Sequence, residues 1–135
     1  MSRLLRVAVA VLLSTAVTAC GVRGADLGTT SSPCFKALPA AYDAVHDGGK
    51  LVGVRIERPG SRSLRRLPGH EQLGRTKICL VAFRGDFDRS TVAHPLATPL
   101  SVPTGPYAVV AVTEDGKRLL GTLVLRRLPL VFRHL

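Results

Sequence analysis

The chain has 135 residues, a formal net charge of +10 and 46% hydrophobic residues, which is enough apolar material for one packed domain. Aromatic residues make up only 4% and Trp is absent, so an aromatic-rich core is excluded and the core must rely on Val, Leu, Ile and Ala. Arginine supplies 15 of the 19 basic residues, and such an excess of positive charge favours polyanionic partners.

The N-terminus has the layout of a secretion signal. Arg3 and Arg6 are followed by an uninterrupted apolar run at residues 7–13, which is diluted from Ser14 onward. An apolar segment of about ten residues fits the hydrophobic region of a signal peptide. Because a transmembrane helix needs roughly 20 such residues, we leave this segment out of the fold prediction.

A cysteine preceded by small residues closes this segment. The sequence Val17-Thr18-Ala19-Cys20 resembles the lipobox of bacterial lipoproteins. The resemblance implies that the Cys20 sulfur receives a diacylglycerol and that the signal is cut just before Cys20. Several acyl chains anchor a protein stably, whereas one chain binds a membrane only marginally. The alternative is an ordinary secretion signal, cut at the same bond, that leaves Cys20 unmodified.

Two further cysteines, Cys34 and Cys79, remain once Cys20 carries lipid. Both would lie outside the cytoplasm, where disulfides persist, so we predict a Cys34–Cys79 disulfide. Closing a loop of this size contributes about 4 kcal/mol in the chain-entropy model. Two buried free thiols are the alternative. No CxxC motif or Cys/His cluster is present, so we expect no metal site and no cofactor.

The chain is predicted to contain three segments. Residues 1–19 form a lipoprotein signal peptide, residues 20–33 form the lipidated N-terminus and a flexible tether, and residues 34–135 form a single small domain. Gly, Ser and Thr dominate the tether, which leaves it little to bury. Fully extended, it reaches about 40 Å, so we expect the domain to stay near the membrane.

The first element expected in the domain is a short helix. Pro39 is placed for its first turn, and Gly48-Gly49 for its end. Apolar residues at positions i, i+4 and i+7 form one face of this helix: Leu38, Tyr42 and Val45.

Two strands are expected next, separated by a basic loop at residues 61–76 that includes one helical turn. The first strand alternates, with Val52, Val54 and Ile56 on one face and Gly53, Arg55 and Glu57 on the other, and Pro59-Gly60 stops it. The second strand, in residues 76–85, is apolar on both faces and is therefore expected to be central. Its two faces are Ile78, Leu80 and Ala82, and Cys79, Val81 and Phe83.

The C-terminal part is predicted to be a hairpin after a proline-rich connection. Residues 94–107 contain four prolines, so we expect them to wrap the surface in an extended form without regular ladder pairing. The hairpin is expected to turn at Asp115-Gly116 in a two-residue type I′ turn. That turn fixes the register as Glu114 with Lys117, Val112 with Leu119, Val110 with Gly121 and Ala108 with Leu123.

Residues 128–132 are expected to add a last edge piece after this hairpin. The elements together predict an α+β fold with one short N-terminal helix packed on a mainly antiparallel sheet of about four strands.

Catalytic motifs are not visible in the sequence. The four histidines lack metal-ligand spacing, and no GxSxG, Walker or GxGxxG motif occurs. Asp86 and Asp88 flank Phe87, which is compatible with cation binding or acid–base chemistry, but a polar turn beside Arg84 and Arg89 is the favoured interpretation. We therefore expect no enzyme activity.

An arginine cluster is the main functional candidate in the domain, and it consists of Arg55, Arg58, Arg62, Arg65 and Arg66. Guanidinium groups match the geometry of phosphates and carboxylates. Outside the cytoplasm the accessible polyanions are lipid headgroups and wall polymers. Nucleic acid is not expected there, and the aromatic platforms of single-strand binders are missing. A solvated charged face without a ligand is the alternative.

These observations predict a membrane-anchored, extracytoplasmic lipoprotein on the outer face of the cytoplasmic membrane. Its expected role is a non-catalytic binding or accessory protein of the cell envelope, in contact with an anionic lipid or wall polymer or with a neighbouring envelope protein. The alternatives are a small envelope hydrolase and a carrier of an apolar ligand. A deep pocket containing His94, Asp86 and Asp88 would favour the hydrolase, and a large apolar cavity would favour the carrier.

Overall fold

The computed structural model describes residues 32–65, 67 and 70–133. The predicted signal peptide, Cys20, most of the tether and Arg66 lie outside these residues. The elements in chain order are η1 (Ser32–Ala37), α2 (Leu38–Ala44), β1 (Lys50–Glu57), α3 (Arg62–Arg65), η2 (His70–Leu73), β2 (Ile78–Asp88), β3 (Thr104–Thr113), β4 (Leu119–Leu125) and η3 (Leu130–Phe132).

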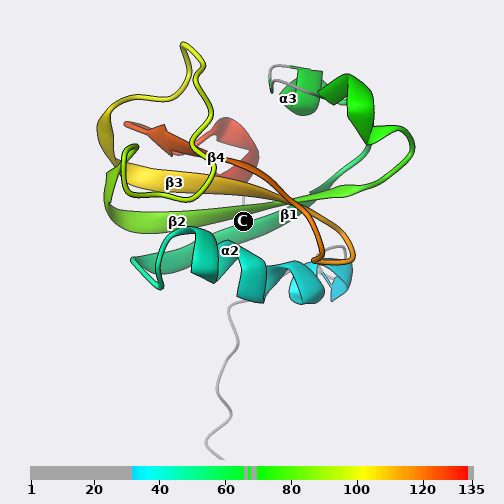
Figure 1. Cartoon of the computed structure of the whole chain (residues 1–135), viewed down its shortest axis with the longest axis horizontal. Helices are drawn as coiled ribbons and strands as arrows, with labels where there is room; N and C mark the ends of the chain where they lie inside the picture. Colours follow the sequence, from blue (N-terminus) through cyan, green and yellow to red (C-terminus); the bar gives the residue numbers. More distant parts are fainter. Residues whose placement is uncertain (1–31, 66, 68–69, 134–135) are drawn as a thin grey trace, which may run out of the picture.

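A single four-stranded sheet forms the centre of the domain, in the order β1-β2-β3-β4. Every neighbouring pair of strands is antiparallel. The helix α2 lies on one side of the sheet and α3 on the other (Figure 1). The α+β architecture with about four antiparallel strands and a short helix is thus the one that the sequence predicts.

The central position of β2 follows from its residues. One of its faces, Cys79, Val81 and Phe83, belongs to a core cluster that also contains α2. The opposite face, Ile78, Leu80 and Ala82, belongs to a second cluster under α3 and η3. All six side chains are less than 9% exposed, so the prediction of a central strand that is buried on both faces is confirmed.

The first core cluster is built on small residues of α2. Ala41 and Ala44 are buried, which lets the helix lie close to the sheet. The ring of Tyr42 meets that of Phe83 edge-on, with centroids 5.0 Å apart. Pro39 lies in the first turn, where its missing N–H costs nothing. None of the helices among the described residues has the length and apolarity that a membrane crossing requires.

A β-bulge in β1 changes one face assignment. Leu51 pairs with Phe83 and Gly53 pairs with Ala82, so Val52 is the extra residue. Because an extra residue inverts the alternation, Val52 packs against the second core cluster, while Val54 and Ile56 pack in the first. The prediction that these three residues share a face is wrong for Val52.

The β3–β4 hairpin differs from its predicted register for the same reason. Val112 pairs with Leu119 as expected, but Leu120 is an extra residue, so Val110 pairs with Thr122 and Ala108 with Val124. The predicted pairs of Val110 with Gly121 and of Ala108 with Leu123 are therefore wrong by one residue.

The turn of this hairpin is also wider than predicted. The Thr113 N–H donates to the Arg118 carbonyl, which closes a loop of residues 114–117. Gly116 has φ +75°, but Asp115 is not among the residues with positive φ. A type I′ turn needs positive φ at both central residues, so the two-residue turn at Asp115-Gly116 is wrong although both residues lie in the loop.

The proline-rich connection covers the outer edge of β4. The Leu96 and Val102 amides donate to the carbonyls of Thr122 and Val124, and Pro95 forms an isolated bridge with Thr122. The connection thus makes ladder-like contacts that we did not expect. Its last residues also join β3, which begins at Thr104.

The C-terminal apolar segment forms η3 rather than an edge strand, which corrects that prediction. Its position is fixed from β1, because an Nη atom of Arg55 donates to the Val131 carbonyl at 2.7 Å.

Candidate functional site

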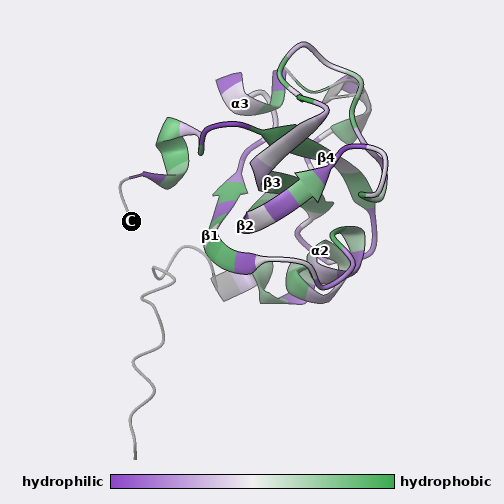
Figure 2. Ribbon diagram, turned by 90° about the vertical axis from the view of Figure 1, so that its left-hand side faces the viewer, coloured by the Kyte–Doolittle hydropathy of each residue, from purple (hydrophilic) through white to green (hydrophobic). Residues whose placement is uncertain are grey.

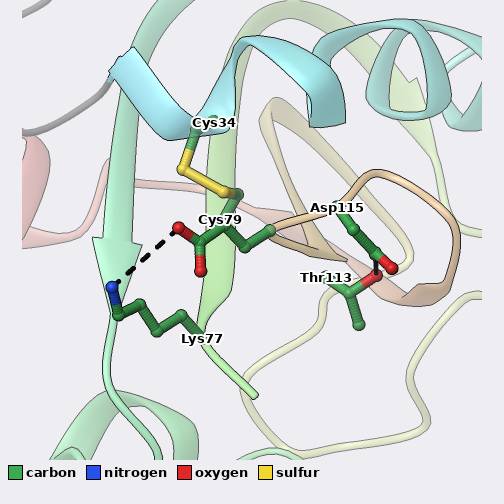
Figure 3. Close-up of a disulfide and its surroundings, with 6 residues drawn as sticks. Cys34, Lys77, Cys79, Thr113 and Asp115 are labelled. Carbon is green, nitrogen blue, oxygen red and sulfur yellow. Dashed lines mark hydrogen bonds and ion pairs between the residues drawn. A yellow bond between two sulfur atoms is a disulfide. The ribbon is translucent and has the colours of Figure 1, made fainter.

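The Cys34–Cys79 disulfide joins η1 to the start of β2 (Figure 3). The two sulfur atoms are 2.02 Å apart, the α-carbons are 5.6 Å apart, and both residues are fully buried in the first core cluster. The predicted disulfide is therefore present, and the alternative of two free thiols is excluded. The bond closes a loop with a sequence separation of 45 residues, which includes α2 and β1.

Polar contacts next to the disulfide link β2 to the hairpin loop. The Glu114 amide donates to the Lys77 carbonyl at 3.0 Å, and the Glu114 carboxylate lies 3.9 Å from the Lys77 ammonium (Figure 3). Glu114 thus pairs with Lys77 across the strands, whereas the sequence predicted Lys117. The two charged side chains are partly exposed, so the pair contributes little to stability.

Asp115 organises the loop itself. Its carboxylate accepts a hydrogen bond from the Thr113 hydroxyl at 2.6 Å and another from the Lys117 amide at 3.1 Å. These hydrogen bonds favour the charged form, so they hold the pKa of Asp115 below its ordinary value of 3.8. Asp115 therefore has a structural role in closing the loop.

The predicted arginine cluster divides into two parts in the structure. Arg55 is half-buried on β1 and holds η3 in place through the Val131 carbonyl. Arg58, Arg62 and Arg65 are exposed in and before α3, and the Arg65 Nε donates to the Gly60 carbonyl at 2.9 Å. Arg66 lies outside the described residues. The exposed arginines are thus gathered on one short segment, and Arg55 has an internal structural contact.

An apolar groove lies against the second face of the sheet, between β4, η3 and the segment around α3. Its volume is about 410 Å³, within the roughly 300–1,000 Å³ of ordinary ligand sites. Figure 2 shows the apolar character of η3 next to the C-terminus. The residues that line the groove are Ser63, Leu67, Leu80, Leu100, Leu123, Leu125, Arg127, Pro129, Leu130, Val131 and Phe132.

Exposed apolar side chains concentrate at this groove. Among the described residues the exposed large hydrophobic side chains are Phe35, Leu100 and Leu130, and two of these three line the groove. Leu130 is 66% exposed and Leu100 is 41% exposed. Arg127 is the one charged residue in the described lining, and it is exposed. The groove therefore combines an apolar wall with a single positive charge.

The acidic pair Asp86 and Asp88 is not joined by His94 in the structure. Both line a shallow depression with Phe87 and Gly105, but His94 is not part of it. The Asp88 carboxylate accepts hydrogen bonds from the Ser90 amide at 2.7 Å and the Ser90 hydroxyl at 2.6 Å. These bonds lower the pKa of Asp88 below 3.8. The polar turn favoured from the sequence is the better description of Asp88.

Metal ligands do not cluster within the part of the chain that the structure describes: no three His, Cys, Asp or Glu side chains lie where they could hold one ion. Comparison of the chain with protein families, curated proteins and solved structures finds no significant match.

The groove was not visible from the sequence, because its lining comes from five separate stretches of chain between Ser63 and Phe132. One signal was present. The alternation in β4 places Leu123 and Leu125 on one face, and an apolar segment that contains Pro129 follows Arg126 and Arg127. That combination indicates an apolar β4 face next to a further apolar segment and a basic pair.

Proposed function

We propose that the mature protein is an extracytoplasmic lipoprotein anchored to the membrane through Cys20, with a non-catalytic binding domain held close to the lipid surface. Two independent observations support this proposal. The lipobox-like sequence ends at Cys20, and the only other two cysteines of the chain are joined in a buried disulfide. Since disulfides are rare in the cytoplasm and persist outside it, the Cys34–Cys79 bond agrees with export. This agreement carries the proposal.

The proposed domain organisation follows the sequence. Residues 1–19 are removed, residues 20–33 tether the domain, and α2 is the N-terminal helix of the mature domain. The protein is proposed to contact the membrane through its anchor. Its further partner is proposed to be an anionic lipid, a wall polymer or a neighbouring envelope protein. Catalysis is not part of this proposal, because Asp88 is engaged in a turn with Ser90 and the sequence contains no recognised catalytic motif.

The anchor is tested by intact mass measurement of the protein purified from the membrane fraction of a bacterium that processes lipoproteins. We expect a chain that begins at Cys20 and carries the added mass of a diacylglycerol, with or without a further acyl chain. The variant Cys20→Ser is expected to leave the membrane fraction. An unmodified Cys20, or a Cys20→Ser protein that stays on the membrane, would contradict the anchor.

The exposed arginines are proposed to add an electrostatic contact with the anionic surface. Each Lys or Arg near such a surface contributes about 1 kcal/mol. The triple variant Arg58→Gln/Arg62→Gln/Arg65→Gln should sediment less with anionic vesicles than the parent protein, and both should show no preference at high salt because the charges are screened. Equal sedimentation with neutral and anionic vesicles at low salt would remove this contact.

A second candidate function is the carriage of an apolar ligand. One observation favours it, namely the open groove of about 410 Å³ whose lining is almost entirely apolar. The groove lies on the face of the sheet opposite to α2, against η3 and the region of α3.

A further inference from the structure

We propose that the apolar groove binds the hydrocarbon chain of a single-chain anionic amphiphile, a fatty acid, whose carboxylate is held by Arg127. The inference deepens the carrier function proposed above and rests on it. It follows from the shape, the lining and the charge of the groove.

The lining matches a hydrocarbon chain and not a polar ligand. Leu80 and the β4 residues Leu123 and Leu125 come from the sheet, and the apolar side chains of η3 face the same space. Ser63 is the only uncharged polar residue in the described lining. A sugar or a peptide backbone would lose hydrogen bonds to water here without replacing them, whereas a methylene chain gains about 0.8 kcal/mol per buried CH₂.

The volume agrees with one chain. A space of about 410 Å³ is small for a lipid with two long chains, but it accepts most of one acyl chain. The groove is open to solvent, and Leu130 and Leu100 remain exposed. A bound chain would cover these two leucines, which are otherwise an unfavourable feature of a surface in water.

The positive charge at the groove favours a ligand with a negatively charged headgroup. Arg127 is the only ionic side chain among the described lining residues, so no neighbouring carboxylate within the lining competes for its guanidinium. Guanidinium groups bind carboxylates with two parallel hydrogen bonds. Its neighbour Arg126 is also exposed but does not line the groove, which makes it a matched control for the effect of charge alone.

The test uses the full chain in membranes isolated from cells that express it. The probes are a 16-carbon fatty acid with a photoreactive diazirine in its chain and the primary alcohol of the same chain. After irradiation and trypsin digestion, labelled peptides are identified by mass spectrometry. We expect the acid to label the peptide of residues 128–133, which contains η3, about threefold more than the alcohol does, as one exposed ion pair predicts.

Variants identify the groove and the charge separately. Leu100→Glu/Leu130→Glu should abolish labelling by the acid, whereas Phe35→Glu, the matched change at the exposed apolar residue outside the groove, should not. Both leucines are exposed, so this variant is expected to fold, and an unchanged thermal unfolding midpoint verifies it. Arg127→Gln should lower labelling by the acid to the level of the alcohol, while Arg126→Gln leaves it unchanged.

Three results would overturn the inference: labelling only of peptides that contain no groove residue, equal labelling by acid and alcohol, or retention of labelling in a folded Leu100→Glu/Leu130→Glu variant. Equal labelling would mean that the groove simply faces the hydrocarbon of the bilayer. The anchor is judged from the same membranes by the mass of the N-terminal peptide without irradiation, so a failure of the lipoprotein proposal is distinguished from a failure of the groove.

Discussion

Gly116, in the β3–β4 loop, lies directly against the backbone carbonyl of Lys36 in η1. A Cβ atom at residue 116 would overlap that oxygen, and the residue has φ +75°. The loop and η1 are therefore in backbone contact on the same side of the domain as the disulfide. This contact requires glycine for two independent reasons, the backbone conformation and the absence of space.

The substitution Gly116→Ala is expected to lower the free energy of unfolding by about 3 kcal/mol. Roughly 1 kcal/mol comes from the left-handed conformation and the rest from the displacement of η1. The matched control is Gly60→Ala, because Gly60 has φ +83° with nothing within 4 Å of an added Cβ atom. Gly60→Ala should lower the free energy of unfolding only by the roughly 1 kcal/mol that the left-handed conformation costs. Urea unfolding followed by circular dichroism measures both, and equal losses would contradict the contact with Lys36.

Removal of the disulfide by Cys34→Ala/Cys79→Ala is expected to lower the free energy of unfolding by about 4 kcal/mol, since the loop closed by the bond restricts the unfolded chain. Both cysteines are fully buried, so a reductant should act on the parent protein only when the chain opens. When reductant is added to the folded parent protein, its free energy of unfolding should therefore fall only slowly, as the disulfide is reduced. A loss below about 1 kcal/mol in the double variant would contradict the chain-entropy argument.

The substitution Arg55→Met retains the apolar stem and removes the hydrogen bond to the Val131 carbonyl. We expect a loss of about 1.5 kcal/mol, because charged donors contribute more than neutral ones. We also expect the variant to exchange its η3 amides faster than the parent protein does, with a smaller change in the strands. Arg58→Met is the control, because Arg58 is exposed nearby on the same segment. If both variants lose the same stability, Arg55 does not hold η3.

The pH dependence of stability provides a fourth prediction. The folded pKa of Asp115 is lowered by the Thr113 hydroxyl and the Lys117 amide, so its contribution is fully present above the unfolded value of about 3.8. The contribution is lost as the pH falls through the lower folded pKa. The difference in free energy of unfolding between the parent protein and Asp115→Asn should therefore be constant near pH 6 and shrink below pH 3.8. A difference that does not change with pH would mean that this carboxylate is not stabilised by the loop.

Residue patterns predicted the elements whose burial follows from local alternation. Both faces of β2 could be assigned, since every residue from Ile78 to Phe83 is apolar and no bulge interrupts that stretch. The disulfide could be predicted from the count of cysteines and from the predicted export of the chain. The bulges at Val52 and Leu120 could not be predicted, because each of these residues is apolar, as is the strand residue before it. Each bulge depends on how the strand pairs with its neighbour.

The candidate site was predicted less well than the fold. Arginine spacing placed Arg58, Arg62 and Arg65 near one another, but Arg55 makes its contact with a carbonyl 76 residues away. The groove depends on how η3 lies beside β4, which is a tertiary arrangement without a local pattern. Arg127 therefore carried no signal in the sequence beyond its charge.

The connection along β4 has a consequence for self-association. Of the two outer strands, β4 is covered by residues 94–102, so β1 is the one outer strand left for a further chain within the part that the structure describes. A sheet that accepts a new strand at both sides can grow into a fibre, whereas one that accepts it at a single side stops after two copies. Pairing of two copies through the described edge of β1 would therefore leave no described outer strand for a third copy.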